Sequence, residues 1–185
     1  MPSKTTETFG KRVALEARRS DLLVLVGVMI ADGFIVKQGD VIGKISASGE
    51  YRRRARATVN TTAFATNSPT GKVLDASVFA ADDVLTNEDG DNVGTIESID
   101  LTTTPHTLTL TGNAAVAVAA GADVLGSDGS QIAQGISDSE TDGTEAVSVP
   151  VIIGGYLDES KLRGLDSTAK TELAGASVAG GVFKF

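Results

Sequence analysis

The residue with the widest catalytic repertoire in this 185-residue chain is its only histidine, His106. Activation of a nucleophile by histidine, or a metal site built from several histidines, would have to depend on this one side chain. His106 follows Pro105 at the start of a Thr-rich run, and no nucleophile-elbow motif accompanies it. The sequence therefore predicts a surface-turn histidine, no catalytic residue, and a protein that is not an enzyme.

The acidic run at residues 87–92, NEDGDN, suggests calcium binding because five of its six residues carry a side-chain oxygen. An EF-hand loop with Gly90 at its sixth position would place Leu85 at the first ligand position, and no Glu falls at the twelfth. We therefore expect a hairpin turn at Asp89-Gly90 and no metal site.

Other cofactor sites are equally hard to find. The chain contains no Cys, which excludes disulfides and thiolate metal ligands, and it contains neither a phosphate-binding loop nor a Rossmann glycine motif. We expect no cofactor.

A cluster of basic residues follows Tyr51 and contains Arg52, Arg53, Arg54 and Arg56. Binding to nucleic acid would use such residues as phosphate contacts, but the cluster lacks stacking aromatics beyond Tyr51 and the chain has a net charge of −8. A solvated face or a protein-docking patch fits this setting better. We expect no nucleic-acid partner.

Charge is distributed unevenly along the chain. Residues 1–56 hold eleven Lys and Arg against six Asp and Glu, whereas residues 57–185 hold five against eighteen. Residues 1–20 are polar and basic with few apolar positions, which is typical of an extended arm. The pattern predicts a basic end that docks and an acidic body that faces water.

The remaining sequence must supply the elements that position these residues. Leu22 to Ala31 is an apolar run too short to span a membrane, and it predicts buried strand. No secretory signal peptide is expected. Residues 39–50 predict a strand in which Gly43 allows close packing, residues 73–125 a small β unit, and residues 147–153 an alternating strand.

Two short helical segments are predicted near the C-terminus. Asp158 opens the first, which Gly164 ends, and Asp166 caps the second, which reaches Leu173 or Ala174. The side chains expected to pack on the sheet are Leu162, Leu165, Ala169 and Leu173. Residues 178–185 predict a final strand, with a bend at Gly180-Gly181.

Several blocks resemble lambda-type bacteriophage head decoration proteins. Residues 39–51, GDVIGKISASGEY, are similar to the family block G-x-V-L-G-K-I-T-A-S-G-K-Y, and residues 128–136, DGSQIAQGI, to D-G-S-x-x-A-x-G-I. Residues 149–162 and the C-terminal stretch from Leu165 resemble the closing strand, helix and strand of the family. The blocks cover about half the chain in the family's order, but the stretch from about Arg56 to Leu125 departs from it.

The resemblance implies an α+β, mostly β fold: a small decoration-protein core of strands with short C-terminal helices. We expect residues 1–20 to form a capsid-contacting arm, residues 21–56 and 125–185 the core, and residues 57–124 an inserted small β domain. The implied partner is the major capsid protein, and the implied assembly is a homotrimer without membrane contact.

The expected function is to cement the outer surface of the expanded phage head, after synthesis in the host cytoplasm. The basic residues then expected to contact the capsid are Lys11, Arg12, Arg18, Arg19, Arg52, Arg53 and Arg54. The alternative is a head fibre or spike-like protein whose inserted domain binds the host surface.

Overall fold

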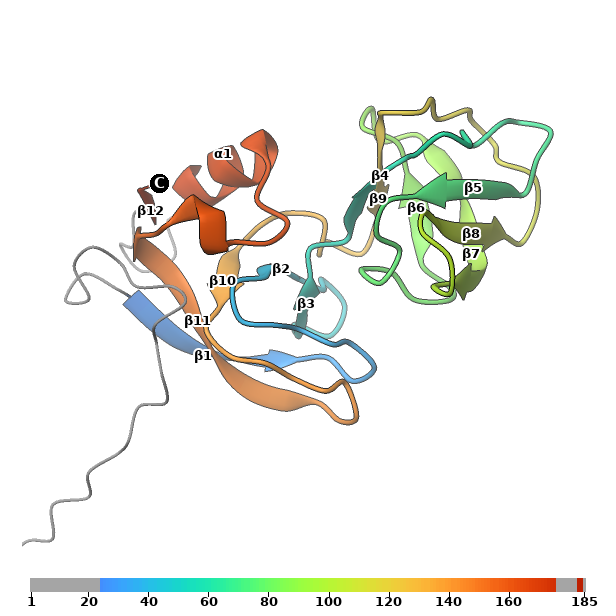
Figure 1. Cartoon of the computed structure of the whole chain (residues 1–185). Helices are drawn as coiled ribbons and strands as arrows, with labels where there is room; N and C mark the ends of the chain where they lie inside the picture. The colour runs from blue at the N-terminus through green and yellow to red at the C-terminus, as the bar shows by residue number, and fades with distance from the viewer. Residues whose placement is uncertain (1–23, 176–182, 185) are drawn as a thin grey trace, which may run out of the picture.

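The computed structural model describes residues 24–175 and 183–184, which form two six-stranded sheets (Figure 1). The first sheet contains β1 (Val24–Ile30), β2 (Val41–Lys44), β3 (Tyr51–Arg53), β10 (Gly135–Ser137), β11 (Val147–Tyr156) and β12 (Phe183–Lys184). The second contains β4 (Arg56–Thr58), β5 (Thr70–Val73), β6 (Val84–Thr86), β7 (Asn92–Asp100), β8 (His106–Leu110) and β9 (Asp123–Gly126). With one 3-10 turn and one α-helix near the C-terminus, this is the mostly β, α+β fold that the sequence predicts.

The second sheet is built from one continuous stretch of chain. The chain leaves the first sheet after β3, forms all strands of the second sheet between residues 56 and 126, and returns to the first sheet at β10. Figure 1 shows the two sheets as separate bodies, joined by the connection from β3 to β4 and by the connection from β9 to β10. The second sheet therefore begins one residue before, and ends two residues after, the range of 57–124 expected for the inserted domain.

Each sheet closes on itself. In the first, β1 pairs antiparallel with β11 along its whole length and meets β3 through the parallel pair Ile30↔Tyr51. In the second, an antiparallel bridge between Val59 and Val73 joins the segments that follow β4 and end β5. In each sheet the closing contact is a single residue pair.

The apolar core is divided between the two bodies. One cluster fills the second sheet and draws its buried residues from Ala55 to Val124, with Phe64 fully buried at its centre. Two smaller clusters lie in the first sheet, one around Ile42 and Val151 and the other under the C-terminal helix. None of the three clusters has buried members on both sides of the junction, so their apolar burial stabilises each body separately.

The C-terminal helical segments agree with the prediction. Asp158 caps the turn η3 (Glu159–Lys161), and Asp166 Oδ1 accepts a hydrogen bond from the Ala169 N–H at 2.6 Å at the start of α1 (Ser167–Gly175). Ala169 and Leu173 are buried against the first sheet, and Leu162 and Leu165 pack beside them. The bend predicted at Gly180-Gly181 lies outside the described residues, and neither helical segment described is long enough to cross a bilayer.

The strand predicted over residues 39–50 is shorter than expected. β2 ends at Lys44, because the chain turns at once and the Gly49 N–H donates to the Ile45 carbonyl, with Gly49 at a φ of +78°. The prediction that Gly43 allows close packing is confirmed. A Cβ atom on Gly43 would lie 2.0 Å from the Ser130 carbonyl oxygen, which belongs to the backbone and has little room to move.

We predict that Gly43→Ala destabilises the protein by at least about 2 kcal/mol, because the new methyl group collides with backbone on the neighbouring segment. Gly112→Ala is the matched control, since a Cβ at Gly112 meets nothing within 4 Å. Urea unfolding measures both. A Gly43→Ala variant as stable as Gly112→Ala would contradict the packing described for β2.

Candidate functional site: the arginine junction between the two sheets

The basic run of the sequence lies where the chain crosses from one sheet to the other. Arg52 and Arg53 end β3 of the first sheet, Arg54 lies in the connection, and Arg56 begins β4 of the second sheet. Since successive side chains of an extended chain point to opposite sides, Arg52 and Arg54 turn inward, where they are 1% and 4% exposed. The junction is therefore built around buried positive charge.

Arg52 is among the largest fully buried side chains and contacts both bodies. Its Nη1 donates to Asp83 Oδ2 of the second sheet at 2.7 Å, and its Nε donates to Ser130 Oγ at 2.8 Å. Nη2 lies 3.1 Å from Asp128 Oδ2, within ion-pair distance but outside hydrogen-bond geometry. The guanidinium also lies 4.8 Å from the centre of the Phe34 ring.

The buried position of the Arg52 side chain requires a glycine at residue 126, the last residue of β9. A Cβ on Gly126 would lie 2.9 Å from Ala55 Cβ and 3.2 Å from Arg52 Nη2. A side chain at this position would therefore displace the guanidinium or the connection beside it.

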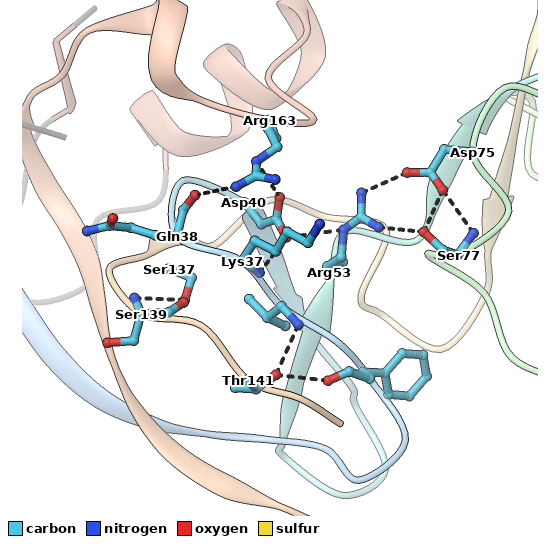
Figure 2. A network of polar contacts seen from close by, with 12 residues as sticks. Lys37, Gln38, Asp40, Arg53, Asp75, Ser77, Ser137, Ser139, Thr141 and Arg163 are labelled. Atoms are coloured by element: carbon cyan, nitrogen blue, oxygen red, sulfur yellow. Dashed lines mark hydrogen bonds and ion pairs between the residues drawn. The ribbon is translucent and has the colours of Figure 1, made fainter. Parts of the chain in front are cut away.

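Arg53 forms a second link between the bodies (Figure 2). Its Nη2 donates to Asp75 Oδ2 at 2.8 Å and its Nη1 to Ser77 Oγ at 2.7 Å, both in the loop after β5, while Nε lies 3.3 Å from Asp40 Oδ2 in the first sheet. Asp40 also accepts from the Lys37 main-chain N–H at 2.8 Å and lies 3.5 Å from Arg163 Nε. One guanidinium thus joins a carboxylate from each body.

Arg54 and Arg56 share Asp166, the cap of α1. Arg54 Nη1 donates to Asp166 Oδ2 at 2.7 Å and Arg54 Nη2 lies 3.0 Å from Glu172 Oε2. Arg56 lies 3.5 Å from the same Asp166 oxygen and pairs within its own sheet with Asp123 and Glu88. The helix cap is therefore fixed by a cation from the connection and by one from the second sheet.

The charges at the junction affect one another's proton affinity. Burial raises the pKa of Asp40, and the Lys37 N–H and the charges of Arg53 and Arg163 offset only part of this effect. Burial would also raise the pKa of Asp166, but the Ala169 N–H and the positive charges of Arg54 and Arg56 together lower it. The lowered pKa keeps the helix cap ionised at neutral pH.

Two crevices flank the arginines. The larger, about 580 Å³, is lined by the exposed side chains Ile35 and Leu101 from opposite bodies, with Arg53 and Asp75 between them. The smaller, about 350 Å³, lies on the Arg54 and Arg56 side. Because the arginines already have carboxylate partners, the geometry supports a joint that holds the two bodies together better than an anion-binding site.

His106 also contributes to structure. It begins β8 and pairs with Val73, and its Nδ1 accepts a hydrogen bond from the Ala76 N–H at 2.9 Å. The prediction of a surface-turn histidine is wrong, because the residue lies in a strand and is half-buried at 18% exposure.

The acidic run at residues 87–92 forms the hairpin turn that the sequence predicts between β6 and β7. Asn87 Oδ1 accepts from the main-chain N–H groups of Asp89 and Asp91, so the loop uses its own oxygen to close the turn. Within residues 24–175 and 183–184, no group of three His, Cys, Asp or Glu side chains is arranged to hold a metal ion.

The expectation of a solvated or docking arginine cluster needs correction. Arg52 and Arg54 are buried and ion-paired inside the chain, so they offer almost no surface to a partner, and Arg53 is only partly accessible. The predicted capsid-contacting residues Lys11, Arg12, Arg18 and Arg19 lie outside the described residues. Reasoning from the sequence missed the partners Asp83 and Asp75, for which the only signal was the acidic composition of the second sheet.

No family model, no curated protein and no solved structure matches this chain.

We predict that Arg52→Ala lowers the free energy of unfolding by about 3 to 5 kcal/mol, because Asp83, Asp128 and Ser130 lose a common partner in a buried setting. Arg163→Ala is the matched control, since Arg163 is about half exposed and its contacts are longer; its expected loss is below about 1 kcal/mol. Urea denaturation at neutral pH compares the two. Equal losses of unfolding free energy in the two variants would mean that the buried ion pairs of Arg52 stabilise the protein no more than the exposed contacts of Arg163 do.

Proposed function

We propose that this chain is a structural virion protein that binds the outer surface of an expanded phage capsid and stabilises it against internal pressure. The resemblance of residues 39–51 and 128–136 to lambda-type decoration proteins supports the proposal, as does the basic charge of residues 1–20, which hold five Lys and Arg against two Glu on a chain with a net charge of −8. The proposed partner is the major capsid protein, and the proposed assembly is a homotrimer.

The observation that carries the proposal is the one-sided pairing of β1. Among the described residues, one edge of β1 is covered by β11 along its length, whereas the other meets a strand only at Ile30↔Tyr51. Within the part of the chain that the structure describes, the main-chain groups between Val24 and Met29 have no strand partner on that edge. A strand from a capsid protein could complete it by β-strand addition.

The surface around this edge suits a protein partner. Met29 is 43% exposed, and Gly27 and its cross-strand neighbour Pro150 are also exposed. This outer face of β1 and β11 presents apolar and small side chains on a chain with a net charge of −8. The proposed contact combines main-chain pairing at β1 with electrostatic steering by the arm.

A capsid presents many copies of the same binding surface, so contacts that are weak one by one add up. Each subunit of a capsid offers the same surface, so a subunit of a trimer that has bound once is held close to the next site. A modest affinity per subunit is then sufficient for stable decoration.

A second candidate is a head fibre whose second sheet binds the host surface. It is favoured by the separate apolar cluster of the second sheet, which makes that sheet a body able to present its own surface. The links through Arg52, Arg53 and Arg56 would then hold a receptor-binding body on an anchored one.

The test is co-sedimentation with expanded shells that lack the protein. We predict that replacing Lys11, Arg12, Arg18 and Arg19 by Gln weakens shell binding on the order of tenfold at low salt, because the steering charge is lost. The matched control removes the same charge from the body, at Lys37, Lys44, Lys72 and Lys161, and should bind as the unchanged protein does. Failure of the unchanged protein to sediment with shells would refute the proposed function.

The same shells distinguish the second candidate. Decorated shells that withstand heating no better than bare ones, but adsorb to host cells only when decorated, would favour the fibre. Raised heat resistance without any change in adsorption would favour cementing.

A further inference from the structure

One link of the junction depends on a hydrogen bond to a histidine ring. His106 is the only histidine of the chain, and its Nδ1 accepts the Ala76 N–H at 2.9 Å. A nitrogen that accepts this hydrogen bond carries no proton, so the ring is neutral with its proton on Nε2. Ala76 is fully buried, and the structure gives its N–H this one acceptor.

The residues on either side of Ala76 hold Arg53 of the first sheet. Asp75 Oδ2 and Ser77 Oγ accept from the two Nη atoms of Arg53 at 2.8 and 2.7 Å. Asp75 Oδ1 in turn accepts from the Ser77 N–H at 3.0 Å, which fixes the two acceptors relative to each other. The hydrogen bond from Ala76 to His106 therefore positions the loop that clamps the arginine.

A proton on His106 Nδ1 is incompatible with this arrangement. Two N–H groups would then point at each other across 2.9 Å, and the buried Ala76 N–H would lose its acceptor. Asp75 Oδ1 lies 3.9 Å from the same nitrogen, so the imidazolium would attract the carboxylate that Arg53 now holds. The first effect removes the hydrogen bond that positions the loop, and the second makes the imidazolium compete with Arg53 for Asp75.

We propose that His106 is a proton-operated latch at the junction. Its neutral ring holds residues 75–77 where they clamp Arg53, and protonation of Nδ1 releases that loop and loosens the second sheet from the first. Arg52 makes a separate hydrogen bond to Asp83, which keeps the two bodies connected while their relative orientation becomes less restricted.

The charged groups around His106 come from each neighbouring element. Lys72 lies on β5, whose Val73 pairs with His106, Asp100 lies at the end of β7 opposite Thr107, and Asp75 lies in the loop that follows β5. The two carboxylates attract an imidazolium, and Lys72 and the nearby Arg53 repel it. Protonation of Nδ1 removes the acceptor of the Ala76 N–H, so a fall in pH shifts the junction toward release.

The test measures the distance between the two sheets in the full-length protein. The chain has no Cys, so Ala117→Cys on the second body and Ala146→Cys on the first, both exposed, accept spin labels without background. At about pH 7.5 we expect one narrow distance distribution, and at about pH 5.5 a second, broader population, because a proton on Nδ1 removes the acceptor of the Ala76 N–H.

The matched variant is His106→Asn. Its Oδ1 can take the place of Nδ1 as acceptor but does not titrate, so the distribution should stay narrow at both pH values. An unchanged distribution in the parent protein at low pH would overturn the proposal. Equal broadening in His106→Asn would also overturn it, because the transition would then belong to another group, such as Asp40.

Hydrogen exchange of the Ala76 amide tests the latch without any substitution. Corrected for the intrinsic effect of pH, its protection should fall on the order of tenfold between the two conditions. Unchanged protection would show that the Ala76 N–H keeps its acceptor and would contradict the latch.

Discussion

The guanidinium of Arg52 imposes the constraint on which the arrangement of the two sheets depends. A positive charge that is 1% exposed must be surrounded by acceptors, and here Asp83 comes from the second sheet while Asp128 and Ser130 come from the returning chain. If the second sheet moved away, the charge would be left buried and incompletely paired. Burial of one arginine thus makes the separation of two otherwise independent bodies costly.

The apolar core is divided between the two sheets, which explains why ion pairs hold the sheets in one relative orientation. Buried apolar contacts are non-directional and stabilise each sheet, but none of the three clusters spans the junction. Ion pairs with fixed geometry specify one orientation instead, and Arg53 and Arg56 add links on either side of Arg52. For a protein proposed to sit on a shell under pressure, a joint of this kind would hold the two bodies together in one orientation.

The sequence predicts local features of this fold well. The caps Asp158 and Asp166 and the turn at Asp89-Gly90 depend on contacts within a few residues, and the structure contains all three. The junction could not be predicted in the same way, because Arg53 meets Asp75 across 22 positions and Arg54 meets Asp166 across 112. In an acidic chain every arginine has many possible partners, and only the closure of both sheets selects among them. One signal was available in the sequence: side chains two positions apart in an extended chain point to the same side, which places Arg52 and Arg54 together.

The most direct test of the joint is a double-mutant cycle on Arg52 and Asp83, with Arg52→Met and Asp83→Asn made singly and together. The free energies of unfolding in urea at neutral pH give the coupling between the two side chains. A direct, buried link between the bodies predicts a coupling of about 2 kcal/mol or more. A coupling within about 0.5 kcal/mol of zero would mean that the two losses are independent, and would contradict the central role of this pair.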